Sequence, residues 1–292
     1  MIHTHLQKSL VRRRTIQTDH FFAFAVYLAA ACVFGAFCWI VFDLVLNGMD
    51  KLSWAFLTEL PVSSGRKGGI SSILVSTLMI LLVTIIAAVP VAFATAIWLS
   101  EFTRNGGRLV IIVRLSLDIL AGVPSIVFGL FGAAFFCVFL GLGYSILAGG
   151  LTLACMVLPI LIRTTEAGLT AVNNGWRQGA AALGLTKSAA LWQILLPAAA
   201  PSIAAGMVLG VGRAMAETAA LIFTSGYVDR MPESVFDSGR ALAIHIFDLS
   251  MNVPGGDKSA YASALVLIVA IGVVNLFALK LSDKLLASRI FT

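Results

Sequence analysis

The chain has 292 residues, of which 59% are hydrophobic and 12% are charged, and its formal net charge is +6. Soluble domains contain about 25% charged residues, and one soluble core of this size could not bury so much apolar side chain. These values exclude an ordinary soluble domain and predict an all-α membrane protein with several spans.

Six transmembrane helices are predicted from stretches that lack acidic and basic residues, because a helix that crosses a bilayer needs about 20 mostly apolar residues. Residues 1–20 form an N-terminal segment, and residues 21–292 form one transmembrane domain. We expect Gly122 and Pro124 to kink the third span. The predicted spans cover about residues 21–42, 73–99, 119–140, 146–162, 197–223 and 259–280.

The distribution of lysine and arginine predicts the orientation. Thirteen of these residues lie on the side of the two termini, six lie on the other side, and Arg213 lies within the membrane. Because cytoplasmic loops carry the excess of basic residues, both termini and the loop of residues 163–196 are predicted to be cytoplasmic. The first apolar stretch is longer than that of a signal peptide, which favours an uncleaved helix.

Few residues suggest catalysis or a bound cofactor. The histidines are scattered, and His245 is expected on the surface of an outer loop. No nucleotide-binding fingerprint or metal motif is present, so we expect no cofactor, no metal site and no catalytic residue. The four cysteines lie inside apolar stretches without a CxxC pair, and they are Cys32, Cys38, Cys137 and Cys155.

The loop of residues 163–196 contains the pattern of a short helix between two breaks. Residues 173–175, Asn-Asn-Gly, end one helix, and residues 176–183 are predicted to form a short second helix. Gly184 supplies a stop with positive φ, and Pro197 is able to open the next span. The small residues 179–182 would let a partner approach closely, although an ordinary turn between two spans explains the same pattern.

This segment resembles the EAA loop of ABC importer permeases, whose pattern is E-A-A-x3-G-x9-I-x-L-P. Gln178 stands at the position of the glutamate, so this chain carries no negative charge there. The resemblance implies that the loop docks onto a separate ATPase subunit, which hydrolyses the ATP. The residues implied in this coupling are Trp176, Arg177, Gln178, Gly179, Ala180 and Gly184.

The fifth predicted span contains an arginine and a glutamate, Arg213 and Glu217. A mid-membrane arginine costs about 2.5–3.5 kcal/mol on insertion scales, and residues four apart share a helix face. Either the pair neutralises itself and fixes helix packing, or it lines a translocation path in which the guanidinium binds an oxyanion. Arg163, at the end of the fourth span, is either an interface anchor or a second anion contact.

Two further segments resemble a narrower family. Residues 120–131, LAGVPSIVFGLF, contain Gly122, Pro124 and Ser125 and are similar to a signature of phosphate-specific ABC importer permeases. Residues 212–219, GRAMAETA, are similar to the GRAxGETA signature of the same family, with Ala216 in place of a glycine. The likeness covers roughly residues 70–280 and points to the PstA-type rather than the PstC-type subunit.

The resemblance implies a type I ABC importer permease in the bacterial inner membrane, surrounded by membrane lipid. Its expected partners are a PstC-like second permease, a PstB-like ATPase dimer, a PstS-like phosphate-binding protein and inorganic phosphate, with no nucleic acid. The chain is then a transport subunit rather than an enzyme. The alternatives are a permease for sulfate or molybdate, a membrane component that senses phosphate, and a membrane enzyme acting on lipids, for which no clustered catalytic residues are found.

Overall fold

The computed structural model describes the backbone of residues 2–103 and 107–290, and the side chains of residues 22–103 and 107–280. The regular secondary structure of the described chain is helical apart from one two-stranded antiparallel hairpin, β1 (Pro61–Val62) and β2 (Lys67–Gly68). The longer helices are α1 (Ile2–Gly48), α3 (Ser71–Ile97), α4 (Arg108–Gly122), α5 (Ser125–Gly132), α6 (Ile146–Ala171), α9 (Leu196–Met215) and α12 (Asp257–Ile290).

Shorter helices connect these elements. They are α2 (Trp54–Thr58), α7 (Asn174–Ala182), α8 (Lys187–Ala190), α10 (Ala219–Ile222) and α11 (Leu242–Met251). A 3-10 turn, η1 (Met49–Lys51), follows α1. Three π-helical segments extend or join the long helices, and they are η2 (Trp98–Phe102), η3 (Ala133–Phe139) and η4 (Leu191–Leu195).

Five continuous helical segments of the described chain are long and apolar enough to cross a membrane, and the number rises to six if one bent pair of helices counts as a span. The five are Phe22–Lys51, Ser71–Phe102, Ile146–Ala171, Lys187–Met215 and Asp257–Lys280. The predicted all-α fold with several spans is therefore confirmed.

The third predicted span, residues 119–140, is broken rather than merely kinked. Helix α4 ends at Gly122, α5 begins at Ser125, and the two axes differ by 103°. Val123 and Pro124 are extended between them. Proline lacks an N–H and disfavours a helical conformation in the preceding residue, so the chain leaves the helix at this point and begins a new one.

The loop expected at residues 163–196 is much shorter in the structure. Helix α6 continues to Ala171, and the next long helix already begins at Lys187, so residues 172–186 alone separate them. The helix passes through Pro197 after the π-helical segment η4. A π turn shifts the hydrogen bonding by one residue, which accommodates a ring that would otherwise clash with the carbonyl four residues earlier.

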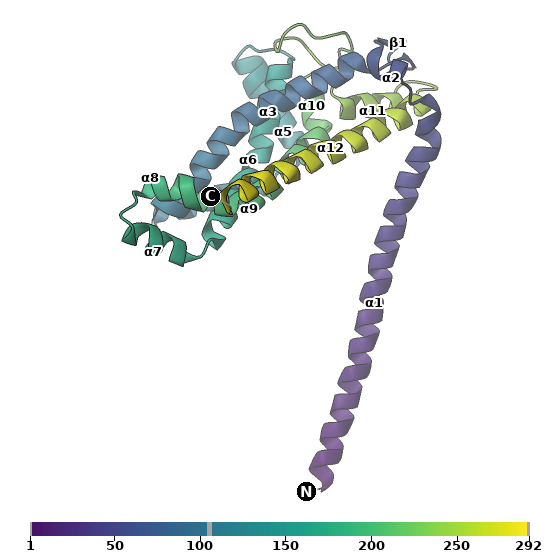
Figure 1. Cartoon of the computed structure of the whole chain (residues 1–292). Helices are drawn as coiled ribbons and strands as arrows, with labels where there is room; N and C mark the ends of the chain where they lie inside the picture. The colour runs from purple at the N-terminus through teal and green to yellow at the C-terminus, as the bar shows by residue number, and fades with distance from the viewer. Residues whose placement is uncertain (1, 104–106, 291–292) are drawn as a thin grey trace.

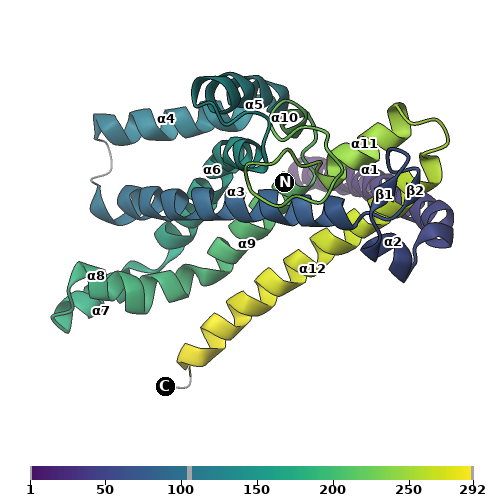
Figure 2. The same ribbon diagram turned by 90° about the horizontal axis from the view of Figure 1, so that it is seen from above.

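Helix α3 has α4 on one side and α12 on the other (Figure 2). Helix α6 is the most buried span and packs against both α3 and α9. Small residues allow its close approach to α9. A Cβ added to Gly206 would fall 2.0 Å from Oγ1 of Thr164, and one added to Gly168 would fall 2.5 Å from Cβ of Ser202. Such contacts are typical of membrane helix pairs, whose association depends on close packing rather than on the hydrophobic effect.

The molecule has two distinct ends, which we call the hairpin end and the α7 end (Figure 1). The hairpin end carries β1, β2, α2 and α11, and the α7 end carries α7 and α8. Helix α1 starts far from the bundle and meets it only near the hairpin end, where Gly48 packs against Tyr261 and Leu265 of α12. Residues 22–40 of α1 are all exposed in the single chain.

Candidate translocation site and coupling loop

Arg213 lies in the last turn of α9, on a face that is open in the single chain. Its side chain is exposed, and Leu209, one turn earlier, is 58% exposed on the same face. The next residue, Ala214, is buried beside Leu81 of α3 and Leu153 of α6, well inside both spans. Arg213 is thus deep in the membrane-spanning region but points away from the chain's own core.

The expected helical pairing of Arg213 with Glu217 is wrong. Helix α9 ends at Met215, so the two residues do not share a helix face. Among the described residues, Arg213 has no ion-pair or hydrogen-bond partner, and Oε1 of Glu217 instead accepts a hydrogen bond from the backbone N–H of Ala220 at 3.3 Å. Glu217 is half-buried at the break between α9 and α10, where its carboxylate satisfies a free N–H of the new helix.

The two motif segments meet in space, although about 90 residues separate them. Helix α5 packs against α10, and Gly129 faces Ala220 with no room for a side chain between them. Ser125 at the start of α5 is half-buried, while Gly122 and Pro124 are exposed. Two interrupted helices therefore lie together near Glu217. Interrupted helices are a common device of transporters, because their ends present unpaired backbone groups to a passing ion.

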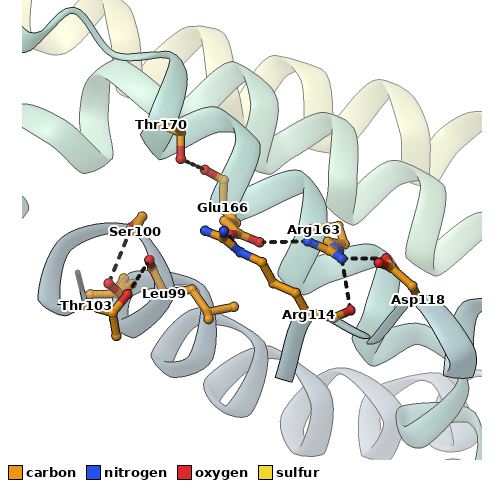
Figure 3. Close-up of polar contacts among 9 residues, drawn as sticks. Leu99, Ser100, Thr103, Arg114, Asp118, Arg163, Glu166 and Thr170 are labelled. Carbon is orange, nitrogen blue, oxygen red and sulfur yellow. Dashed lines mark hydrogen bonds and ion pairs between the residues drawn. The ribbon is translucent and has the colours of Figure 1, made fainter. Parts of the chain in front are cut away.

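Arg163 belongs to a network of four charged side chains that joins α4 to α6 (Figure 3). Its guanidinium pairs with Asp118 and, at 3.4 Å, with Oε2 of Glu166, and it donates to the carbonyl of Arg114 at 3.0 Å. Arg114 approaches Oε1 of the same glutamate at 2.8 Å. The Glu166 side chain is 9% exposed and that of Asp118 is 63% exposed.

The network changes the role expected for Arg163. Its charge is balanced within the chain, and its position on α6 places it nearer the α7 end than Arg213. An anion would reach this guanidinium by replacing Asp118, its exposed partner, since Glu166 is held by two arginines. The structure does not bring Arg163 together with Arg213 and Glu217 into one contact group.

Five of the six residues implied in coupling lie in the short helix α7, and Gly184 follows it. Trp176, Gln178 and Gly179 are exposed, while Ala180 is 3% exposed and packs inward. Gly184 has φ of +73° and ends the helical turn, as predicted for a stop that favours glycine. A groove of about 450 Å³ runs along the helix and is lined by Asn173, Gly175, Trp176, Gly179, Ala180, Leu183 and Ile194.

Arg177 differs from its neighbours because it turns into the protein. Its guanidinium pairs with Glu101, in the π-helical end of the α3 span, at 2.6 Å between Nη2 and Oε1. The same side chain donates to the carbonyls of Leu169 and Val172, both at 2.8 Å. Arg177 therefore fixes α7 to the ends of two spans.

Three functional candidates were missed in the sequence, and they are Glu101, Arg114 and Glu166. Each lies just outside a charge-free stretch, where a charged residue normally faces the membrane surface. The only available signal was that Glu101 and Glu166 stand among basic residues on the side predicted to be cytoplasmic. Their pairing depends on how distant segments pack, and no local spacing reveals it.

His245 is buried, which contradicts its expected surface position. It lies on α11 with no exposed area, and its ring faces Gly65 in the turn of the hairpin. Neither ring nitrogen has a hydrogen-bond partner in the described part of the chain. Burial, together with the positive charge of Arg240, lowers the pKa of His245 from 6.5 to about 4. The imidazole is therefore neutral at physiological pH.

Comparisons with known proteins identify the family. The family model described as binding-protein-dependent transport system inner membrane component matches residues 88–291. The phosphate transport system permease protein PstA of Pasteurella multocida is 36% identical over 198 residues, which are 67% of this chain and 70% of that protein. The probable ABC transporter permease YqgI of Bacillus subtilis is 29% identical over 272 residues, which are 88% of this chain and 91% of the relative.

Solved structures support the same fold. A bacterial ABC transporter for import of the polysaccharide alginate matches with a TM-score of 0.61 and 15% identity, over 88% of this chain and 96% of that chain. The inward-facing MetNI methionine ABC transporter matches with a TM-score of 0.55 and 17% identity, over 74% of this chain and 94% of that chain. The chain therefore belongs to the family of inner-membrane components of binding-protein-dependent transport systems, the permease subunits of ABC importers.

Proposed function

We propose that this permease forms, with a second permease, the translocation path of an ATP-driven importer of inorganic phosphate. Its relatives named PstA support the choice of substrate, including PstA 2 of Mycobacterium tuberculosis, which is 32% identical over 77% of this chain and 73% of that protein. Relatives alone do not say how an anion would be held. The chain's own residues support a way of holding the anion.

The observation that carries the proposal is the unpaired guanidinium of Arg213. An arginine that faced lipid at this depth would be strongly disfavoured, and no carboxylate of the described chain neutralises it. Its open face must therefore meet water or another protein surface. A second permease placed there would enclose a wet path, with Arg213 as its positive group. The planar fork of donors suits two oxygens of a phosphate.

Glu217 and Arg163 take different parts in this proposal. The carboxylate of Glu217 lies at the end of α9, half-buried, and offers an acceptor to the proton of a monohydrogen or dihydrogen phosphate. It also prevents the site from becoming so positive that the anion is trapped. Arg163 provides a second, weaker station because Asp118 competes for its guanidinium. An ion that meets weak sites in sequence is bound without being retained.

The two ends of the molecule take different partners in this proposal. An ATPase dimer binds the groove of α7 from the cytoplasm, and both termini lie on that side of the bacterial inner membrane. A phosphate-binding protein delivers its ligand at the hairpin end. The exposed small residue Gly179, beside which a Cβ would meet no atom within 4 Å, supports close approach of the ATPase. ATP binding and hydrolysis then change which end of the path is open.

Uptake by the assembled transporter tests the substrate. The complex of both permeases, the ATPase and the binding protein is reconstituted in vesicles, and ATP-dependent accumulation of labelled phosphate, sulfate and molybdate is measured. The proposal expects accumulation of phosphate that excess sulfate or molybdate does not inhibit. Accumulation of sulfate or molybdate in place of phosphate would assign the chain to another oxyanion importer.

A further inference from the structure

Every donor of the Arg177 guanidinium has an acceptor, and two of the hydrogen bonds go to Glu101. Nε and Nη2 donate to the two carboxylate oxygens at 3.2 and 2.6 Å, so the pair is bidentate. The remaining donors reach the carbonyls of Leu169 and Val172 and, at 3.3 Å, the side-chain oxygen of Asn174. Planar bidentate pairs of this kind fix both distance and orientation.

This contact differs from a surface ion pair because both of its side chains are largely buried. The side chains of Arg177 and Glu101 are 25% and 15% exposed. Exposed pairs contribute little because water and salt screen them, whereas a largely buried charge that loses its partner is strongly destabilised. The contact is therefore costly to break, and its strength depends less on ionic strength than that of a surface pair.

The contact joins α7 to the ends of the two spans that lead toward the proposed anion site. Arg177 lies in α7, Glu101 lies in η2 at the end of the α3 span, and the accepting carbonyls belong to the end of α6. Helices α3 and α6 pack along each other and continue to Leu81 and Leu153, beside the end of α9 that carries Arg213. Helix α7 is thus rigidly connected to the helices around the proposed anion site, so a displacement of α7 would move them.

We propose that Arg177 and Glu101 are positioning residues that transmit movement of α7 to the α3 and α6 spans. Arg177 does not touch the ATPase and acts through Glu101, while its exposed neighbours Trp176 and Gln178 provide the docking surface. Gln178 is uncharged, so the charged connection of this loop is directed inward rather than to the partner. The inference rests on the proposed function, because it assumes that an ATPase moves α7.

Coupling between ATP hydrolysis and uptake tests the inference. Arg177→Ala, Glu101→Gln and the double variant are compared with wild type in the reconstituted transporter, and labelled phosphate accumulated per ATP hydrolysed is measured. Each single variant should lower this ratio at least about tenfold while ATP hydrolysis continues, because the broken pair leaves one buried charge unmatched. The double variant should be no worse than either single one, since both changes remove the same interaction.

Arg177→Lys and Arg108→Ala complete the series. Lysine keeps the charge but loses the fork, so the ratio should fall between those of wild type and Arg177→Ala. Arg108 is exposed at the start of α4 and has no ion-pair partner among the described residues, so its loss should leave the ratio unchanged. Wild-type coupling in both single variants, or additive losses in the double variant, would overturn the inference.

Amide hydrogen exchange separates this inference from the identity of the substrate. Exchange across residues 172–186 is measured in the purified full-length chain with its permease partner, without nucleotide. Loss of the contact should accelerate exchange in this loop for Arg177→Ala and Glu101→Gln but not for Arg108→Ala. Unchanged exchange would overturn the inference even if the variants failed to bind the ATPase. Failure of wild type to take up phosphate would refute the proposed substrate and would leave this measurement valid.

Discussion

Gly129 of α5 contacts Ala220 of α10 so closely that a Cβ on the glycine would fall 2.9 Å from the Cα of the alanine. The same added atom would lie 3.2 Å from the carbonyl oxygen of Ala219. Backbone atoms cannot rotate away as a flexible side chain does, so the position requires glycine. This contact holds the two motif segments together beside the break that contains Glu217.

Replacing Gly129 with valine should therefore separate α5 from α10. We expect a loss of about 2 kcal/mol in stability, which is typical of overpacking in a well-packed interior. Thermal unfolding of the purified permease pair measures the effect, with Gly272→Val as the control. A Cβ at Gly272 on α12 meets nothing within 4 Å. Equal melting temperatures for the two variants would show that the close contact is not required.

The two acidic residues of the charged network should contribute unequally to the stability of the permease. Glu166→Ala removes the buried carboxylate between Arg114 and Arg163 and should destabilise the permease by about 3 kcal/mol, because two guanidinium groups lose their shared partner. Asp118→Asn alters an exposed pair and should change stability by less than about 1 kcal/mol. Thermal unfolding at low and high salt measures both, and a larger effect of Asp118→Asn would contradict the assigned burial.

His245 should make the stability of the hairpin end depend on pH. Burial holds its pKa near 4 in the folded protein, below the 6.5 of an exposed histidine, so the unfolded chain binds more protons between these values. The neutral imidazole is compatible with folding above pH 6.5, and stability is lost as the pH falls toward 4. The full difference corresponds to about 3 kcal/mol.

His245→Leu provides the matched comparison for this titration. Leucine fills a similar volume and does not titrate, and neither ring nitrogen gives up a hydrogen bond with the described residues. Melting temperatures of the two proteins are compared at about pH 7.5 and about pH 5, where wild type alone should lose stability by this mechanism. A parallel decrease in both proteins would assign the pH dependence to other groups.

The groove of α7 should accept a partner only while Gly179 is small. Gly179→Trp adds an aromatic ring at an exposed position where a Cβ would meet no atom within 4 Å, so the permease should fold and insert normally. Binding of the ATPase should weaken about tenfold or more because the ring blocks a closely packed interface. Co-purification measures it, with Met251→Trp at the hairpin end as the control. Normal recovery of the ATPase with Gly179→Trp would exclude docking at this groove.

Much of the fold was predictable because membrane insertion imposes a simple pattern on the chain. Charge-free stretches located the spans, and Gly184 correctly marked a helical stop through its positive φ. The 103° break between α4 and α5 was underestimated. Pro124 indicates that hydrogen bonding is interrupted, but the angle that follows depends on the neighbours against which each half packs.

The candidate site was less predictable. No proline or glycine lies among residues 216–225, so nothing in the local sequence shows that α9 ends between Arg213 and Glu217. The inward turn of Arg177 likewise depends on Glu101, which lies 76 positions earlier in the chain. Burial of His245 depends on a hairpin that is distant in sequence. Sequence patterns identified charged groups near the membrane, whereas tertiary packing determined their partners.

Phosphate uptake by an Arg213→Gln variant tests the central claim most directly. The reconstituted transporter should still assemble and hydrolyse ATP, but uptake should fall about a hundredfold, because glutamine cannot replace charge-assisted hydrogen bonds to an anion. Arg108→Gln, which changes an exposed arginine at the start of α4, should transport at the wild-type rate. Wild-type uptake by Arg213→Gln would show that the anion does not pass this guanidinium.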